Sequence, residues 1–419
     1  MRNPKRIAAT NCEFWLPEAV IQQIQSFLSE KQAAQTSILS KSWYSAWLTR
    51  PKLDFDQCRF GCDYGSYEDV RRFLESARNT MQRYEESNLK LESFRLSMDR
   101  KQRDCCIISD ELTSKALKLG ATKLLLSVRL GYSTFPMTLN ACEFRNIKFL
   151  WLECLNIDPV FSDDSPSEFP CMKVLKLHSC FSRKGIRISS VSLERISFAH
   201  NNISMATLDV PNIRKFTFSS RITLPSLDFE RAPGDWVTDL SIEWRGNYFK
   251  TSWFHELEKF LEGLSLSKIS LFLEIGLADK VLFDYAPDIQ GLSNPVVENL
   301  TIKLHRKYIA GDCIFKCLFR SCGPKFITQC WEDLQRRGWS WRLDDNVLRL
   351  LCKTLMLDVS ENCCVPNRNT SRLPGLEEVH VECFEETLAK WRPLSLKTLL
   401  DASTSLEDKQ LIRFRLKWR

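Results

Sequence analysis

The chain has 419 residues, of which 44 % are hydrophobic and 26 % are charged, a composition that indicates a globular protein and excludes a disordered one. Its net charge of +7 is modest for this length, so we expect no nucleic-acid partner. No apolar run is long enough for a signal peptide or a membrane span, so we expect no membrane association.

The first fifty residues predict three short helices. Pro17 suits the first turn of a helix, because its missing N–H has no partner there. A second helix is expected over residues 30–39, and a third carries Trp43 and Trp47. A unit this small buries too little surface to be stable alone, so it must dock on its own chain or on another protein. Apolar residues of the first helix recur at steps of three and four: Val20, Ile21, Ile24, Phe27 and Leu28.

The ordered motif "LPEAVIQQIQSFLSEKQAAQTSILSKSW" resembles the F-box, and the resemblance covers residues 14–55, including "PKLDFD", a tail typical of large plant F-box families. It departs at "LSEKQAAQ", where many members have Leu-Pro before the second helix. In such proteins this unit binds a Skp-type adaptor and so joins a cullin-RING ubiquitin ligase. The resemblance implies that eight residues make or support the adaptor contact: Leu16, Pro17, Ile21, Ile24, Leu28, Ile38, Leu39 and Trp43.

Two features border this segment. Trp47 either ties the F-box to the next part of the chain or packs within the F-box, and the sequence leaves both roles open. Residues 56–90 are expected to form a connecting helix and N-terminal cap, because "SYEDVRRFLESARNTMQRYEE" has an apolar helical stripe. The stripe consists of Val70, Phe73, Leu74, Ala77, Met81 and Tyr84.

Further along, short segments with alternating apolar residues predict strands. Most start 20 to 31 residues after the preceding one, the spacing of leucine-rich repeats, and "FPCMKVLKLHSC" resembles their L-x-L-x-x-[NC] core. A sandwich fits less well, because the connections are too long for hairpins. The expected strands are 93–98, 123–128, 148–154, 173–180, 194–200, 214–220, 238–244, 267–275, 298–305, 353–359 and 377–383.

We therefore expect an α+β fold (an α/β solenoid), in which a three-helix F-box precedes an irregular leucine-rich-repeat horseshoe. Residues 1–13 would be an extension, 91–405 degenerate repeats and 406–419 a C-terminal capping strand at a sheet edge. A helix over 251–267 indicates a repeat unit with strands on one face and helices on the other.

Cysteine usage indicates the compartment. The 17 cysteines are odd in number and scattered, which favours reduced thiols and a cytoplasmic or nuclear location. The cluster "CIFKCLFRSCGPKFITQC" (313–330) lacks CxxC spacing, so it predicts a buried helix rather than a zinc site.

Within each strand, the residues between the buried apolar ones are expected to face the concave surface of the repeats. An aromatic spot flanked by mixed charge suits a protein or peptide segment. A register error of one residue would instead bury Trp151. The candidate substrate-binding residues are Trp151, Lys176, His178, Lys215, Phe272 and Lys303.

The sequence contains no phosphate loop, GxSxG, HExxH or CxxC motif, so we expect no catalytic residue, metal or cofactor. The resemblance implies a non-catalytic substrate-recognition subunit of an SCF-type ubiquitin ligase, which binds an adaptor and an unidentified protein substrate. The alternative is a repeat-based scaffold or small-ligand receptor whose N-terminal helices serve only as a cap.

Overall fold

The computed structural model describes a mixed α/β protein that divides into two compact units, Met1–Phe135 and Pro136–Arg419. We call them the N-terminal and C-terminal units. The boundaries predicted for the F-box, repeat and capping segments stay predictions. The described residues are 16–28, 30–59, 67–100, 103–130, 141–161, 169–221, 223–284, 295–305, 311–328, 351–352, 354–355, 373, 375–385, 387–395 and 412–419.

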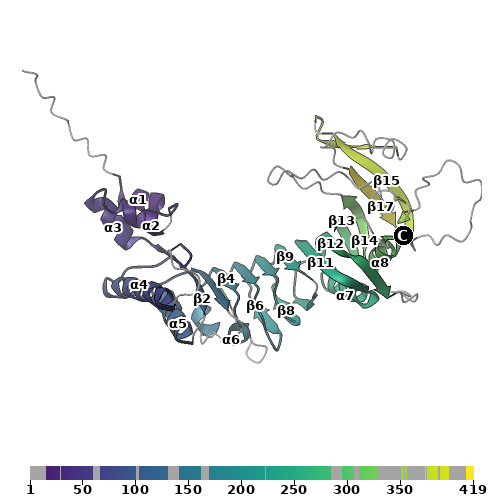
Figure 1. Ribbon diagram of the computed structural model, residues 1–419. Helices are drawn as coiled ribbons and strands as arrows, with labels where there is room; N and C mark the ends of the chain where they lie inside the picture. The colour runs from purple at the N-terminus through teal and green to yellow at the C-terminus, as the bar shows by residue number, and fades with distance from the viewer. Residues whose placement is uncertain are drawn as a thin grey trace, which may run out of the picture. The chain divides into compact units, whose positions relative to one another are not determined.

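The N-terminal unit begins with helices α1 (Glu18–Gln25), α2 (Glu30–Thr36) and α3 (Lys41–Thr49), which lie together (Figure 1). The hydroxyl of Ser40 accepts a hydrogen bond from the Trp43 N–H and caps α3. Buried Gln25 joins all three helices, because its Nε2 donates to Thr36 Oγ1 at 3.0 Å and to the Trp43 carbonyl at 3.1 Å. Polar contacts thus do much of the packing in a segment that has few buried apolar residues.

The rest of the N-terminal unit alternates strands and helices: β1 (Lys52–Asp56), α4 (Tyr67–Glu86), β2 (Ser93–Arg100), α5 (Arg103–Lys118) and β3 (Lys123–Leu130). The strands pair in parallel in the order β1-β2-β3. The helix expected before residue 90 is confirmed as α4, and all six residues of its predicted stripe are buried. Strand β1 and helix α5 were not predicted.

Trp47 links α3 to α4. The guanidinium of Arg83 on α4 lies 5.6 Å from the centroid of the Trp47 ring. Nearby, the buried hydroxyl of Tyr84 donates to the carbonyl of Arg50 at 2.7 Å. The Trp47 ring also lies 6.2 Å from that of Tyr44 on α3, so contacts of both kinds left open for Trp47 are present.

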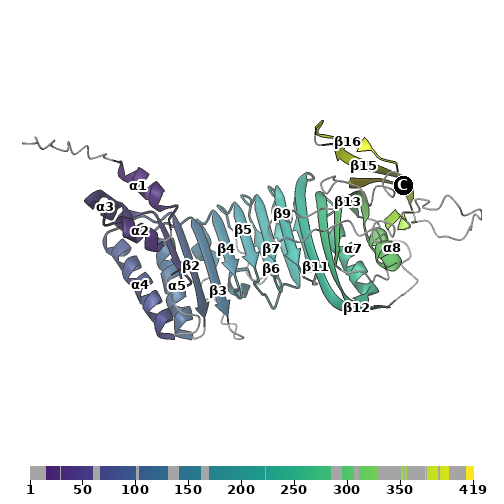
Figure 2. The ribbon, with the colours of Figure 1, turned by 45° about the horizontal axis from the view of Figure 1, so that its top comes forward.

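The C-terminal unit is built on a run of parallel strands (Figure 2). Along each of the short strands buried and less buried residues alternate, so one face of the sheet is core and the other is accessible. In spatial order the strands are β4 (Phe149–Glu153), β5 (Val174–His178), β7 (Arg195–Ala199), β9 (Lys215–Ser220), β11 (Trp236–Lys250), β12 (Ser267–Asp284), β13 (Val296–His305) and β14 (Gly323–Thr328).

A second parallel sheet, β10-β8-β6, covers the buried face in the middle of this unit (Figure 1). Its strands are β6 (Ile186–Ser189), β8 (Met205–Asp209) and β10 (Ser226–Glu230), so the chain visits the two sheets alternately. Phe216 of β9 packs against Phe229 of β10 with ring centroids 5.4 Å apart. The expectation that helices line the face opposite the strands does not hold here, because an extended strand crosses the layer in fewer residues than a helix needs.

Hydrogen bonds join successive turns of the chain at the position of the predicted repeat core. In "VLKLHSC", the sixth position of the core that begins at Leu175 is Cys180, whose Sγ contacts the carbonyl oxygen of Leu152 at 3.3 Å. In the next repeat Asn201 takes that place, accepts from the Cys180 N–H at 2.8 Å and donates to the Leu177 carbonyl at 3.0 Å. Side chains at this position therefore satisfy backbone groups that the strands leave unpaired.

Further helices in the described part of the C-terminal unit are η1 (Ala141–Phe144), α6 (Asp158–Phe161), α7 (Thr251–Glu262) and α8 (Gly311–Ser321). Helix α7 confirms the predicted helix, and its apolar stripe is buried. The prediction of one helix over 313–330 is only half right: α8 ends at Ser321 and β14 begins at Gly323. Glycine and proline at 323 and 324 end the helix, which the apolar pattern alone did not indicate.

Two predictions near the C-terminus are wrong. Strand β17 (Ile412–Trp418) is not an edge strand, because it lies antiparallel between β14 and β15 (Leu376–Glu385). Strand β15 also pairs antiparallel with β16 (Lys390–Pro393), so it is not a parallel repeat strand. Alternation specifies a strand with one buried face and leaves its pairing partner open.

The strand expected at 353–359 is contradicted in its described part, where Thr354 is helical and follows helical residues 351 and 352. A short apolar run does not distinguish a buried helix from a strand. The rest of that prediction lies outside the described residues.

Candidate functional site

The N-terminal helices carry a concentration of exposed apolar side chains. Of the fourteen large hydrophobic residues that are exposed in the described part of the chain, seven lie between residues 16 and 44. Phe27 is 79 % exposed and Ile38 is 86 % exposed. We call these seven residues the N-terminal apolar surface: Leu16, Val20, Ile24, Phe27, Ile38, Leu39 and Tyr44.

The periodicity of α1 explains how this surface arises. Each residue turns the helix by about 100°, so Val20 and Ile24 fall on one side of α1, and exposed Phe27 lies in the turn that follows the helix. Ile21 and Gln25 fall on another side and are buried, with Ile21 only 1 % exposed. Helix α1 therefore turns one apolar side toward its own chain and leaves a second apolar side in solvent.

The residues implied for adaptor contact divide into two groups. Five are exposed: Leu16, Pro17, Ile24, Ile38 and Leu39. Ile21 is buried, and Leu28 and Trp43 are half-buried, so these three are placed to support the surface. Their role stays a prediction.

Sequence reasoning missed three members of the surface. Val20 and Phe27 were part of the predicted stripe, and Tyr44 was placed on the third helix, but none was assigned to the adaptor contact. The step of four that joins Val20 and Ile24 carried the signal, since these two residues share a helix side that excludes Ile21. Phe27 lies in the turn beyond the helix, where the pattern does not assign it to a side.

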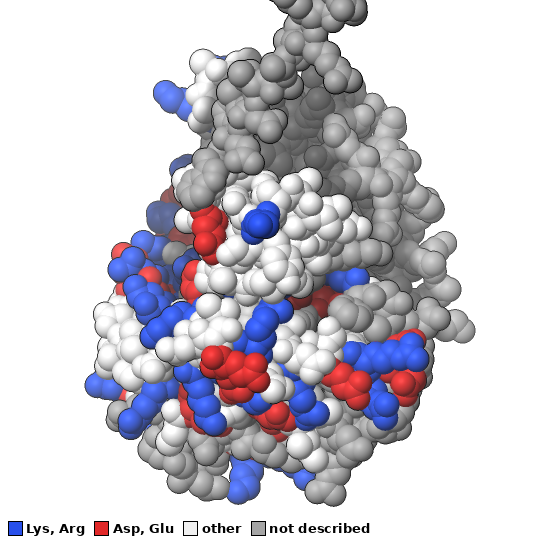
Figure 3. All heavy atoms as spheres, turned by 90° about the vertical axis from the view of Figure 1, so that its left-hand side faces the viewer, with Lys and Arg blue, Asp and Glu red and all other residues white. Residues whose placement is uncertain are grey.

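Charge distinguishes this region from the following helix. Figure 3 shows a broad area with few charged side chains over the N-terminal helices, and beyond it a zone where acidic and basic residues mix. On α4 the mixture includes pairs of Arg71 with Glu68 and Glu75. The N-terminal apolar surface is therefore bordered by polar surface, as expected of a docking face.

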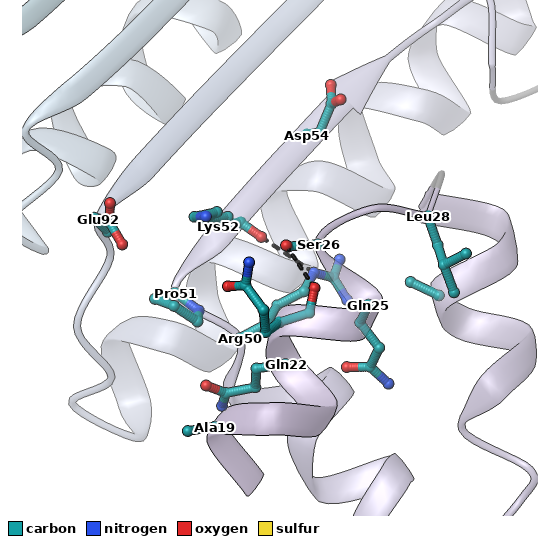
Figure 4. A pocket seen from close by; sticks show the side chains of 12 residues that line it. Ala19, Gln22, Gln25, Ser26, Leu28, Arg50, Pro51, Lys52, Asp54 and Glu92 are labelled. Atoms are coloured by element: carbon teal, nitrogen blue, oxygen red, sulfur yellow. Dashed lines mark hydrogen bonds between the residues drawn. The ribbon is translucent and has the colours of Figure 1, made fainter.

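A small polar hollow of about 200 Å³ lies between α1 and β1 (Figure 4). Its lining includes Gln22, Ser26, Arg50 and Lys52. Arg50 donates to the carbonyl of Trp47 at 3.0 Å and to that of Lys52 at 3.2 Å, so it joins α3 to β1. These contacts indicate a structural role, on a side of α1 distinct from the apolar surface.

In the C-terminal unit, the predicted orientation of the strands is confirmed. Leu150 and Leu152 of β4 are fully buried, whereas Trp151 between them is only half-buried. Lys176 stands beside Trp151 in the parallel register, with its Nζ 5.2 Å from the Trp151 ring and 5.7 Å from that of Phe149. An aromatic pair with a cation over it therefore marks the accessible face.

Only some of the predicted substrate-binding residues come together. Trp151, Lys176 and His178 meet on β4 and β5. Lys215 pairs with Asp239 on β11 at 2.6 Å, and Lys303 of β13 lies 3.5 Å from Glu274. With Phe272 on β12, these are spread along the sheet and do not form one compact site. Their assignment to substrate binding stays a prediction.

His178 stands in a row of polar groups at the ends of adjacent strands. Its Nδ1 lies 3.1 Å from Glu153 Oε1 on β4. Its ring contacts that of His200, which follows β7, with centroids 5.8 Å apart. Partial burial of the ring is the main cause that lowers the pKa of His200, and the nearby His178 and Arg221 lower it further. Sequence reasoning missed both His200 and Arg221. His200 is the last residue of the predicted strand 194–200, where alternation with Ile196 and Phe198 assigns it to the buried side, and Arg221 lies just beyond the predicted strand 214–220.

The structure gives no sign of a reactive thiol at the described buried cysteines. Burial raises the pKa of Cys180 and Cys322 to about 12, so both stay protonated at neutral pH. Among the residues that the structure describes, no group of three or more His, Cys, Asp and Glu side chains is placed to hold a metal ion. Within the same residues, no helix is long and apolar enough to cross a membrane.

These features define a mixed α/β protein in which helices with an exposed apolar surface precede parallel-strand repeats. No protein-family model matches the chain. It is 34 % identical over 140 residues to a putative FBD-associated F-box protein of Arabidopsis thaliana, covering 33 % of this chain and 30 % of the relative. It is 28 % identical over 210 residues to an F-box/FBD/LRR-repeat protein of the same plant, covering 43 % and 45 %.

A third relative, an Arabidopsis thaliana F-box/LRR-repeat protein, is 26 % identical over 243 residues, covering 49 % of this chain and 58 % of the relative. The chain thus matches less than two thirds of the length of each of these relatives. The predicted resemblance to plant F-box/leucine-rich-repeat proteins is confirmed.

Proposed function

We propose that this protein is the substrate-recognition subunit of an SCF-type ubiquitin ligase. Residues 14–55 would form a three-helix F-box that binds a Skp-type adaptor. The strands of the C-terminal unit would belong to a leucine-rich-repeat horseshoe that holds the protein to be ubiquitinated. The chain itself would be non-catalytic, and it would act in the cytoplasm or the nucleus.

The observation that carries this proposal is the N-terminal apolar surface. Exposing a large apolar side chain in place of burying it forgoes about 1.5–3 kcal/mol. Seven such residues on three short helices and the segments that flank them therefore favour a partner that removes them from water. A stable heteromeric contact buries about 800 Å² per partner, which a surface of this kind can supply.

The contribution of the protein to the reaction would be positional. An adaptor on the N-terminal helices and a substrate on the repeats would be held by one chain, which raises the effective concentration of the target lysine near the ligase. The transfer chemistry would belong to other subunits, and the names of the plant relatives fit this adaptor-type role.

The test is binding of an Arabidopsis Skp-type adaptor to the purified full chain. Each central anchor of an interface contributes about 2 kcal/mol, so replacing Ile24 and Phe27 with serine is expected to weaken binding by roughly a thousandfold. The matched control replaces two exposed apolar residues of the C-terminal unit, Val191 and Met205, with serine.

If the wild-type chain is folded and does not bind the adaptor, the proposal fails. The N-terminal helices would then serve as a cap of a repeat-based scaffold or small-ligand receptor. Equal weakening by the control pair would also contradict the proposal, because it would trace the loss to general exposed hydrophobicity.

A further inference from the structure

An open hollow of about 690 Å³ lies at the C-terminal ends of β5, β7 and β9. His178, His200, Asn202 and Arg221 are among the residues that line it. His200 sits in the left-handed region at φ 53°, where the chain turns out of β7. That turn sets its ring against the ring of His178.

Five strands contribute charged or titratable groups around this hollow. Glu153 on β4 faces His178 on β5, and His200 follows β7. Arg221 follows β9, and its Nε lies 3.7 Å from Glu243 Oε2 on β11. The two histidines therefore occupy the centre of the row, with one permanent cation beside them and a carboxylate at each end.

The contact with Glu153 determines which ring nitrogen of neutral His178 carries the proton. A carboxylate only accepts hydrogen bonds, so the proton of the neutral ring belongs on Nδ1, which leaves Nε2 without one. In the doubly protonated ring both nitrogens are donors, so Nε2 can then donate to an anion. The ring is 37 % exposed, so a ligand can reach it.

Resting on the proposed substrate-binding role of this face, we propose that His178, His200 and Arg221 form a subsite for an anionic side chain of the bound protein segment. We call it the histidine pocket. Its ligand is an oxyanion, the carboxylate of an acidic residue or the phosphate of a modified one. Binding is coupled to uptake of a proton by the histidine pair.

The surroundings support a protein segment as the source of this anion. Trp151 and Lys176 lie on the strands that carry Glu153 and His178, on the same face and nearer the start of each strand. An extended segment could thus place an apolar side chain on Trp151 and an acidic side chain in the pocket. Two histidines alone do not complete a metal site, and within the described residues no third ligand joins them.

The proposal is tested by following the histidine rings of the full chain by NMR during pH titrations. The probes are N-acetylglutamate methylamide, the corresponding phosphoserine derivative, and inorganic phosphate, with sodium chloride at matched ionic strength as the reference. Proton-linked binding predicts that at least one amino-acid probe raises the apparent pKa of His178 and His200 by about one unit. His380, which faces Glu378 at 3.3 Å outside the pocket, is the matched histidine and should not respond.

A variant pair sharpens this result. Arg221→Gln removes the permanent cation and is expected to weaken probe binding by about tenfold. Lys268→Gln removes another exposed cation of the same sheet, one that lies on β12 and pairs with Asp235 at 2.7 Å, and should leave binding unchanged. Equal effects of the two variants would overturn the assignment of the pocket.

Two further outcomes would overturn the proposal. All histidines could respond alike, which would indicate general screening. Inorganic phosphate alone could shift His178 and His200, which would indicate a site for a free ion and not for a protein segment. Adaptor binding is scored separately: Arg221→Gln should bind the adaptor as the wild type does, so failure of the ligase role and failure of the pocket are distinguishable.

Discussion

The N-terminal helices and the strands of the C-terminal unit both carry regularly spaced apolar residues, but they place these residues in opposite ways. On β4 to β9, alternate residues such as Leu150 and Phe216 are fully buried. On α1 and in the turn that follows it, Ile24 and Phe27 face solvent although Ile21 is buried. The difference shows that apolar content alone does not define a core. The strands bury their apolar side chains within their own unit, whereas the helices leave some of theirs exposed to a partner.

The largest expected effect concerns the core between the two sheets. Phe216→Ala should lower the free energy of unfolding by about 3–5 kcal/mol, because the ring is fully buried against Phe229 and Trp236. Urea denaturation measures this loss. Val191→Ala at an exposed position is the control and should change stability by less than about 0.5 kcal/mol. A loss below about 1 kcal/mol for Phe216→Ala would contradict the two-sheet packing.

The next effect concerns the polar contacts between repeats. Asn201→Ala should destabilise the chain by about 2–4 kcal/mol, because it leaves the Cys180 N–H and the Leu177 carbonyl without their partner. Asn202→Ala changes the adjacent, exposed residue and serves as the matched control. Equal stability of the two variants in chemical denaturation would show that Asn201 does not hold successive turns together.

The N-terminal apolar surface should behave in the opposite way to the core. Ile38→Ser is expected to change the free energy of unfolding by less than about 0.5 kcal/mol, because the side chain is already in solvent. The same variant should weaken adaptor binding by about 2 kcal/mol if Ile38 is an anchor. Calorimetry of unfolding and of binding gives both quantities. A large loss of stability would place Ile38 in a core and break the comparison.

The smallest effect is a pH dependence within the C-terminal unit. The pKa of His200 is lowered in the folded protein, so the unfolded chain takes up a proton first as the pH falls. Stability should therefore decrease slightly as the pH drops through about 6.5, the ordinary value for histidine. His200→Gln should flatten this part of the profile and His380→Gln should not. The measurement is the unfolding midpoint of each variant between pH 8 and pH 5. A wild-type stability that rises as the pH falls would contradict the prediction.

The local sequence pattern was sufficient to predict a helix or strand wherever that element buries one regular face. The stripe from Val70 to Tyr84 gave α4, and the paired apolar residues of 148–154 and 173–180 gave β4 and β5 with their correct orientation. Short strands such as "IRIS" of β6 were missed, because four residues carry too little periodicity to separate a strand from a loop.

The residues of the candidate sites likewise divide into those that a local pattern predicts and those whose position depends on tertiary packing. Trp151 and Lys176 were found because they lie between apolar residues of the same strands. His200 and Arg221 were missed because they belong to turns whose positions depend on the stacking of β5, β7 and β9. Val20 and Phe27 were not assigned because a stripe does not reveal which of its residues face the chain and which face solvent.

The sequence by itself determined the helical start, the alternating strands and the resemblance to plant F-box/leucine-rich-repeat proteins, since periodicity and motif order are local properties of the chain. Only the tertiary structure decided that β17 inserts between β14 and β15 and that β6, β8 and β10 form a second sheet. Strand pairing joins residues far apart in sequence, and its choice depends on which edges are available when the chain packs.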